Sequence, residues 1–124
     1  TYGVDPEAMA EVGELLRLFE IDTKTGVADD AFTTVDLSAG QRKRLALIVA
    51  VLERRPICIL DEWAADQDPM FRQKFYDELL RMLKDRGITV IAVTHDDRYY
   101  DRADRRLHME EGRIVSVGPE NAHA

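Results

Sequence analysis

The stretch Ile57-Cys58-Ile59-Leu60-Asp61-Glu62 decides the fold class, because an apolar run leads directly into two adjacent carboxylates. A continuous apolar run is typical of a strand in a parallel sheet, which is buried on both faces. Ligands of open α/β sheets bind beyond the carboxyl ends of such strands, where Asp61 and Glu62 stand. An acidic residue there can hold Mg²⁺ through water, and a second carboxylate can polarise an attacking water. Two solvated acids at a strand end would give the same pattern, so this stretch alone does not decide function.

The residues that follow continue the alternation of strand and helix. Asp68-Pro69 is an N-cap with proline at the first helical position, and Gly87 is a typical helix end. The helix between them carries one apolar face, formed by Phe71, Phe75, Leu79 and Leu83. Residues 88–93 predict a second buried strand that ends in Thr94-His95-Asp96. Parallel strands would bring His95 to the same sheet edge as Asp61 and Glu62, although a histidine at a strand end is more often a surface residue.

The flanking segments complete an α/β pattern with a parallel sheet. Asp5-Pro6 predicts the start of a first helix, and a second helix is expected from Ser38 to about Arg54. The polar residues 22–36, interrupted by Gly26, are expected to form a loop. A short helix is expected over residues 98–103, and residues 107–109 and 113–117 flank Glu110-Glu111-Gly112 as a hairpin.

The strongest single motif is Leu37-Ser38-Ala39-Gly40-Gln41, directly before a helix. Ser38 followed three residues later by Gln41 is a capping box, and that role alone would explain both residues. The free N–H groups and the dipole at a helix start also favour a phosphate, and Gly40 lets the backbone approach a ligand closely. The motif is therefore compatible with both a structural cap and an anion site.

Composition is that of an ordinary globular chain. Of 124 residues, 33% are charged and 45% are hydrophobic, with a net charge of -7. An acidic balance argues against a nucleic-acid surface, which usually carries a basic stripe. The single Cys58 lies within an apolar run and is expected to be a small buried residue rather than a catalytic thiol. No apolar run approaches the roughly 20 residues of a membrane span, and no signal peptide is expected at the start.

The motifs taken in order resemble those of ATP-binding cassette (ABC) ATPases over about residues 32–117. The resemblance implies that residues 37–41 are the signature motif, that Asp61 is the Walker B aspartate and that His95 is the switch histidine. It implies that Glu62 is the catalytic glutamate, acting as general base or orienting the attacking water. The D-loop would be Ala65, Asp66, Gln67 and Asp68. The implied fold is a partial P-loop NTPase, with a helical subdomain over residues 1–55 and the C-terminal part of the parallel-sheet core over residues 56–124.

The resemblance also implies ligands and partners. ATP would be the substrate and Mg²⁺ the metal, held by Asp61 through water. Two ATPase domains would face each other head to tail as a homodimer. Ser38, Gly40 and Gln41 would contact the γ-phosphate of ATP held by the P-loop of the partner domain, and His95 would contact a γ-phosphate too.

A finer likeness is to the bacterial exporters of cyclic and siderophore-type peptides. It rests on residues 38–47, on Asp61 to Pro69 and on His95-Asp96-Asp97-Arg98-Tyr99. Trp63 stands where most ABC ATPases have proline, and Ala64-Ala65 stand where most have Thr-Ser; both departures fit this subfamily. Such an exporter would carry a fused transmembrane domain and work at the cytoplasmic face of the bacterial inner membrane, with the present chain soluble by itself. The exported compound is not readable here, because substrate contacts belong to the membrane domain.

The phosphate-binding P-loop motif is absent from the sequence. The lysine of Lys24-Thr25 would require glycines at positions now held by Leu18 and Thr23. We therefore expect residues 1–124 to be the C-terminal half of an ATPase domain that neither binds ATP tightly nor hydrolyses it alone. An ABC-type ATPase of DNA repair or chromosome maintenance shares these motifs and is the competing hypothesis. A regulatory or interaction segment without activity is a third.

Overall fold

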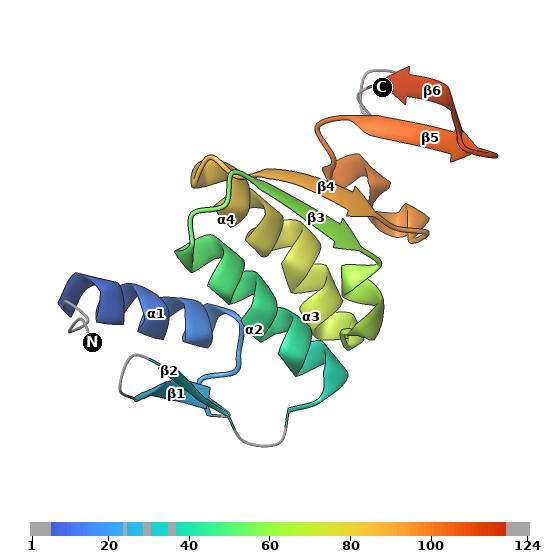
Figure 1. Ribbon diagram of the computed structural model, residues 1–124. Helices are drawn as coiled ribbons and strands as arrows, with labels where there is room; N and C mark the ends of the chain where they lie inside the picture. The colour runs from blue at the N-terminus through green and yellow to red at the C-terminus, as the bar shows by residue number, and fades with distance from the viewer. Residues whose placement is uncertain (1–5, 24, 29–30, 35–36, 119–124) are drawn as a thin grey trace. The chain divides into compact units, whose positions relative to one another are not determined.

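A computed structural model describes residues 6–23, 25–28, 31–34 and 37–118, and it resolves two compact units (Figure 1). The first unit comprises residues 1–58 and 87–89, and the second comprises residues 59–86 and 90–124. The predicted start of the first helix at Asp5 lies outside the described residues. The functional division expected between residues 55 and 56 stays a prediction.

The core of the first unit is formed by two helices, α1 (Pro6–Leu18) and α2 (Ala39–Leu52). Phe19 and Ile21, which follow α1, are fully buried, and the apolar face of α2 supplies Leu47, Ile48 and Val51. Arg44 of α2 is buried as well, and its guanidinium donates a hydrogen bond of 3.3 Å to the carbonyl oxygen of Phe19. This bond gives a polar partner to a carbonyl just past the end of α1, where helix carbonyls lack partners of their own.

The loop expected over residues 22–36 contains a small hairpin instead. Strands β1 (Thr25–Ala28) and β2 (Ala31–Thr34) pair in antiparallel fashion, with Val27 opposite Phe32. The polar composition and Gly26 concealed the strand preference of Thr, Val and Phe, which fit a pleated surface well. The prediction of a loop was therefore wrong for these eight residues.

The two predicted strands exist and pair with each other as β3 (Ile57–Asp61) and β4 (Thr89–Val93). Thr89 N–H donates to Pro56 O at 2.8 Å, and Glu62 N–H donates to Val93 O at 2.9 Å. From the first bond to the second, the residue numbers rise on both strands, so the strands run parallel, as expected. Their carboxyl ends therefore meet.

Burial of these strands differs from the prediction. Cys58 and Leu60 are buried, whereas Ile59 is 70% exposed, and on β4 both Ile91 and Val93 are exposed. Successive side chains of a strand point to opposite faces, so this alternation means that only one face of β3 is covered within the described residues. Cys58 is the small buried residue that the sequence indicated.

The second unit is built around a continuous helical stretch with three parts. These are α3 (Pro69–Lys74), a π-helical turn η2 (Phe75–Leu79) and α4 (Leu80–Asp85). Asp68 caps α3 through a hydrogen bond of 3.0 Å from Phe71 N–H, which confirms the predicted start. The predicted apolar face is confirmed too, because every member is buried: Phe71, Phe75, Leu79 and Leu83. The π-helical turn was not predicted.

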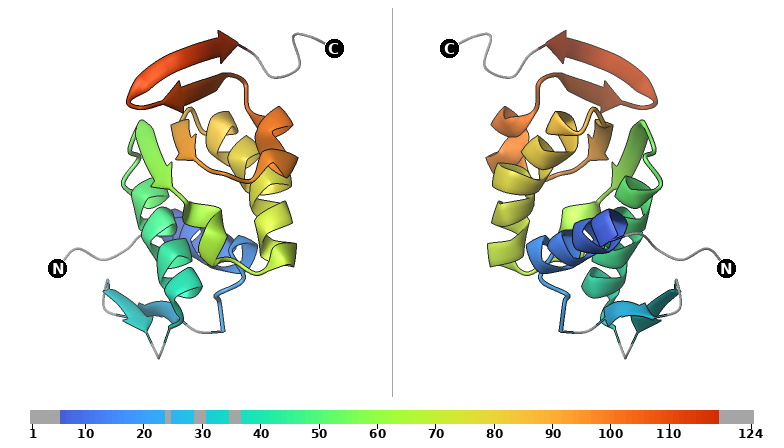
Figure 2. Two further views of the ribbon diagram at one scale, coloured as in Figure 1. Left: turned by 90° about the vertical axis from the view of Figure 1, so that its right-hand side faces the viewer. Right: turned by 90° about the vertical axis from the view of Figure 1, so that its left-hand side faces the viewer.

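Short turns and a hairpin complete this unit. The 3₁₀ helix η1 (Trp63–Asp66) follows β3, and η3 (Asp97–Arg102) takes the place of the short helix expected over residues 98–103. Strands β5 (Arg106–Glu110) and β6 (Arg113–Gly118) form the predicted hairpin and lie side by side in both views of Figure 2. Glu111 and Gly112 both have positive φ, of 49° and 76°, as a two-residue type I′ turn requires.

Apolar side chains remain exposed on several strands of the described residues. They are Ile57 and Ile59 of β3, Ile91 and Val93 of β4, and Leu107, Met109, Ile114, Val115 and Val117 of the hairpin. In the part of the chain that the structure describes, none of the helices has the length and apolar character needed to cross a bilayer. Large exposed apolar surfaces on a globular chain mark contacts with other protein surfaces.

We predict that purified residues 1–124 self-associate, because these side chains have no cover of their own. Multi-angle light scattering over a range of concentrations is expected to show a mass that rises above that of one chain. Ile59→Lys places a charge on an exposed side of β3 and should lower the association, while Met70→Lys, at another exposed apolar residue, is the matched comparison. A concentration-independent monomer would contradict the prediction.

Candidate functional site

Glu62 and His95, which follow the ends of β3 and β4, meet at the carboxyl end of the strand pair. His95 Nε2 lies 3.1 Å from Glu62 Oε1, and the two side chains are 89% and 38% exposed. The Glu62 N–H bond to Val93 O holds the two strand ends together directly below this contact. The structure thus brings together two residues that are 33 positions apart in the sequence and that the motif analysis had paired.

Glu62 has a left-handed backbone conformation, with φ 54° and ψ 34°. A residue with a Cβ atom rarely adopts this conformation, which costs about 1–3 kcal/mol and is concentrated at functional sites. Here the conformation ends the strand abruptly and begins the η1 turn. The backbone therefore turns away while the Glu62 carboxylate stays at the strand end, within reach of His95.

An open pocket of about 340 Å³ lies beside this pair in the second unit. Its polar lining includes Glu62, Arg72, Tyr76, Thr94, His95 and Asp96. Carboxylates, a cation and hydroxyls converge on one hollow, which is the arrangement expected of a binding or catalytic site.

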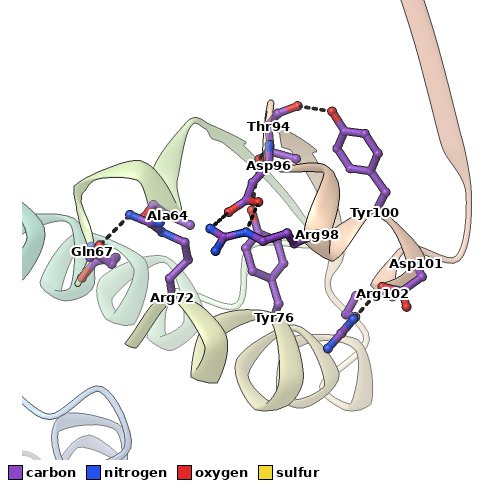
Figure 3. A network of polar contacts seen from close by, with 10 residues as sticks. All are labelled: Ala64, Gln67, Arg72, Tyr76, Thr94, Asp96, Arg98, Tyr100, Asp101 and Arg102. Atoms are coloured by element: carbon purple, nitrogen blue, oxygen red, sulfur yellow. Dashed lines mark hydrogen bonds and ion pairs between the residues drawn. The ribbon is translucent and has the colours of Figure 1, made fainter. Parts of the chain in front are cut away.

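Asp96 enters this pocket region as half of a bidentate ion pair. Arg98 donates to both Asp96 carboxylate oxygens, at 2.8 and 2.9 Å (Figure 3). The hydrogen bonds from Arg98 lower the pKa of the Asp96 carboxyl below its ordinary value. Asp96 therefore stays ionised at neutral pH, and its carboxylate is turned toward Arg98.

Asp61, the last residue of β3, has an exposed side chain. Carboxylate oxygen is the ligand type that Mg²⁺ prefers, and Mg²⁺ usually keeps several waters and takes one or two protein carboxylates together with phosphates. The described residues contain no group of three or more potential metal ligands. Asp61 thus fits the metal as a single ligand acting beside phosphate and water.

The expected D-loop residues form the η1 turn and the entry to α3. Ala65 and Asp66 are exposed, Gln67 is 3% exposed, and Asp68 caps α3. The turn is held from the helix side by Arg72, which donates to Ala64 O at 3.2 Å and to Gln67 O at 3.0 Å (Figure 3). One guanidinium therefore ties the residue before the expected D-loop and a residue within it to α3.

Trp63 explains one departure from the broad family pattern. Its ring is buried, and it stacks on Phe75 with centroids 4.6 Å apart and an interplanar angle of 26°. It also lies 6.3 Å from the Phe71 ring. An aromatic residue here anchors the start of η1 on the helical stretch, where proline would restrict only the backbone.

The signature residues lie in the first unit and are described separately. Ser38 accepts a hydrogen bond of 3.2 Å from Gln41 N–H, and Gln41 Oε1 accepts one of 2.9 Å from Ser38 N–H. The predicted capping box is therefore confirmed. Gly40 is buried at the helix start, and Arg42 donates to Leu37 O at 2.7 Å. The cap does not test a second role of Ser38, Gly40 and Gln41 toward phosphate, which stays a prediction.

Two residues of the pocket were not singled out from the sequence. They are Arg72 and Tyr76, which both lie on the helical stretch 69–85. The π-helical turn that carries Tyr76 leaves no pattern that could be recognised beforehand. One signal in the sequence could have indicated them. Both residues follow the N-cap Asp68, at a spacing of four and eight positions, and therefore lie on the helix that begins where the expected D-loop ends.

The chain is similar in sequence to known ATP-binding proteins. The family model described as "ABC transporter" matches residues 5–65. The ATP-binding protein SyrD of Pseudomonas syringae pv. syringae is 60% identical over 84 residues, which are 68% of this chain and 15% of that protein. The lipoprotein-releasing system ATP-binding protein LolD of Bordetella pertussis is 40% identical over 108 residues, covering 86% of this chain and 44% of that one.

The chain is also similar in three-dimensional structure to a solved protein. The structure of cbiO1 from Clostridium perfringens, described as part of the ABC transporter complex cbiONQ, superposes with a TM-score of 0.69. The two are 31% identical, and the match covers 96% of this chain and 46% of cbiO1. The chain thus spans less than half the length of each of these relatives.

The parallel strand pair, with carboxylates and a histidine at its carboxyl end, defines part of an α/β nucleotide-binding domain of the P-loop NTPase class. Within that class, the chain belongs to the ATP-binding domains of the ABC family, and it resembles those of the peptide exporters.

We predict that Arg72→Met lowers the free energy of unfolding by about 2 kcal/mol, because hydrogen bonds from a charged group to buried backbone acceptors are worth about 1.5–3 kcal/mol. Urea titration of residues 1–124 at low concentration, followed by the fluorescence of Trp63, measures the change at the turn itself. Arg81→Met, at an exposed position of α4, should leave the midpoint unchanged. Equal midpoints for the two variants would show that Arg72 does not hold the D-loop.

Proposed function

We propose that the chain is the catalytic and signature half of an ATPase domain that drives export across a membrane. The observation that carries the proposal is the contact of 3.1 Å between Glu62 and His95 at adjacent ends of parallel strands, beside an open polar pocket. Two unrelated core strands would not be expected to deliver a carboxylate and an imidazole to one point. The family membership established above supports ATP as the ligand.

Glu62 and His95 divide the work at the reacting phosphate. Glu62 orients the attacking water or takes its proton, which its half-exposed carboxylate beside the pocket allows. His95 is a donor toward the γ-phosphate. Its contact with Glu62 keeps the imidazole and the carboxylate close to each other. This is catalysis by positioning and charge stabilisation, as in phosphoryl transfer generally.

Asp61 holds Mg²⁺ through water at the exposed end of β3. When bound, the metal neutralises charge on the phosphate oxygens. Asp61 and Glu62 are adjacent residues, but Asp61 still belongs to the strand, whereas Glu62 has a left-handed conformation and begins the turn. One carboxylate is therefore available to the metal while the other faces His95.

The signature residues act on a second nucleotide. Ser38, Gly40 and Gln41 stand at the start of a 14-residue helix, where N–H groups and the helix dipole favour phosphate. Residues 1–124 contain no P-loop motif, so the phosphates of ATP must be bound by a P-loop outside these residues. A head-to-tail pair of domains would place each signature against the P-loop of the other, with the D-loop residues 65–68 between the two sites. Residues 1–124 alone are expected to be inactive for the same reason.

The likeness of residues 38–47, Asp61 to Pro69 and His95 to Tyr99 to the cyclic-peptide exporters supports a peptide exporter among the possible transporters. We therefore propose export of a cyclic or siderophore-type peptide, with a fused transmembrane domain, at the cytoplasmic face of the bacterial inner membrane. LolD, by contrast, is named for lipoprotein release. The family model is described as "ABC transporter" and LolD is named for a releasing system, which favours transport over DNA repair, and no nucleic-acid partner is proposed.

The functional division of the chain is part of the same proposal. Residues 1–55 would form the helical subdomain segment that ends in the signature helix. Residues 56–124 would form the C-terminal part of the ATPase core, with Walker B, D-loop, switch histidine and hairpin.

We predict that Glu62→Gln in the complete protein lowers ATP turnover by about 10²-fold or more, because a neutral amide cannot act as the base. ATP affinity should stay near that of the wild type, since the substitution removes no binding contact. Turnover is measured by phosphate release and affinity by calorimetry. The exposed Glu78→Gln is the matched comparison and should retain full turnover. A Glu62→Gln protein that hydrolyses ATP at nearly the wild-type rate would overturn the assignment.

Mixed dimers test whether Ser38 serves the partner's nucleotide. One subunit carries Ser38→Ala and the other carries a substitution of its P-loop lysine. If sites are shared, one site loses both contributions and the other keeps both, so about one intact site of activity should remain. If each domain completes its own site, both sites are damaged, and activity should fall to the level of the homodimeric mutants.

Two further measurements make the mixed-dimer result decisive. ATP occupancy is determined beside turnover, because coupling between the sites can suppress both. The free energy of unfolding of Ser38→Ala is determined too, since loss of the cap by itself costs about 1 kcal/mol.

A further inference from the structure

The placement of His95 depends on its backbone rather than on packing of its ring. The His95 side chain is 89% exposed, so few atoms surround it. The residues on either side, Thr94 and Asp96, are only partly exposed and carry the contacts of this segment. Whatever orients Thr94 and Asp96 therefore also orients the imidazole toward Glu62.

Thr94 is held from three directions in Figure 3. Its Oγ1 accepts a hydrogen bond of 3.2 Å from the Tyr76 hydroxyl and one of 3.0 Å from Asp96 N–H. These two bonds use both lone pairs of the hydroxyl oxygen. The Thr94 carbonyl oxygen accepts a longer bond of 3.4 Å from the Tyr100 hydroxyl. The Tyr76 bond ties this segment to the helical stretch 69–85.

Tyr76 is itself rigidly placed. Its ring stacks on Tyr99 with centroids 4.2 Å apart and an interplanar angle of 10°, and it meets Phe75 edge-on at 5.1 Å. Burial is the largest cause that raises the pKa of the Tyr76 hydroxyl above 10.0, so the proton stays on at neutral pH. A protonated and immobile hydroxyl is a suitable fixed donor.

The π-helical turn is what presents this donor. In the η2 turn, the neighbours Phe75 and Tyr76 are both buried. Phe75 stacks on Trp63 of the η1 turn, and the Tyr76 hydroxyl donates to Thr94. Turns of this kind inside α-helices are frequent at functional sites. The same turn thus contacts the segment that follows Glu62 and the segment that contains His95.

We propose that Tyr76 is a positioning residue for His95, acting through Thr94, and that it is required for full ATP turnover. This inference rests on the proposed function of His95. A role in packing alone would be met equally well by phenylalanine, because the ring makes all the stacking contacts. The hydroxyl is the part that only the positioning role needs.

The first test is Tyr76→Phe in the complete protein. Loss of one hydrogen bond is expected to lower kcat about threefold to tenfold, with KM for ATP and calorimetric affinity unchanged. Tyr99→Phe removes the hydroxyl from the ring that stacks on Tyr76 and is the matched control, with kcat expected to stay at the wild-type value. Equal kcat for wild type and Tyr76→Phe would overturn the proposal.

The second test asks whether the effect passes through His95. Single-turnover hydrolysis of labelled ATP at high protein concentration measures the residual rate of His95→Ala. Adding Tyr76→Phe to that variant should change the rate little, because the group that Tyr76 positions is gone. A threefold to tenfold loss in both backgrounds would show a general structural effect and would contradict the proposal. Adding Tyr76→Phe to Thr94→Val should be equally silent.

A third measurement separates this inference from the proposed function. Hydrogen exchange of a peptide that contains residues 94–96, in the protein without nucleotide, should be about threefold faster or more in Tyr76→Phe and unchanged in Tyr99→Phe. If the wild-type protein hydrolyses no ATP, the proposed function fails while faster exchange still supports the positioning contact. Unchanged exchange together with normal wild-type turnover would reject the Tyr76 role alone.

Discussion

The hydrogen bond of 2.9 Å from Glu62 N–H to Val93 O is the interaction on which the candidate site depends. It closes the parallel pair of β3 and β4 at their carboxyl ends, so that the next residues on each strand emerge side by side. Glu62 then leaves the strand in a left-handed conformation, and His95 follows two residues after Val93. The contact between the carboxylate and the imidazole is a consequence of this backbone arrangement, since the His95 ring has little packing of its own.

The helical stretch over residues 69–85 is the support for that arrangement. Arg72 binds two carbonyl oxygens of the turn after β3, and Phe75 carries the stacked ring of Trp63. The next residue, Tyr76, binds the segment after β4 through Thr94. Three consecutive anchors on one side of a helix therefore reach both segments that leave the strand pair. A shift of this helix would move the carboxylate and the imidazole together.

Buried and exposed parts of the site serve different purposes. The aromatic rings and the arginine bonds lie beneath the surface, where hydrogen bonds hold their geometry best. The groups proposed to meet nucleotide are exposed or half-exposed, as they must be to reach a ligand: Asp61, Glu62, His95 and, in the other unit, Ser38. The turns that carry Glu62 and His95 are held by Arg72 and Tyr76, whereas Ser38 is held by its own capping bonds.

The sequence by itself determined the strand ends, the caps and the apolar helix face of this protein. Asp68-Pro69, Ser38 with Gln41, and the run that ends in Asp61 and Glu62 are local signals, because capping and the apolar pattern of a strand depend on residues close in the chain. The strand pairing decided what these signals could not: that Glu62 and His95 touch, and that only one face of β3 is covered. The hairpin at residues 25–34 escaped prediction because weak strand preferences become visible only when two segments pair. The role of Arg72 depends on the turn that it binds, and the role of Tyr76 depends on a π-helical turn and on contacts with Thr94 and Tyr99 far along the chain, so only the tertiary structure could reveal them.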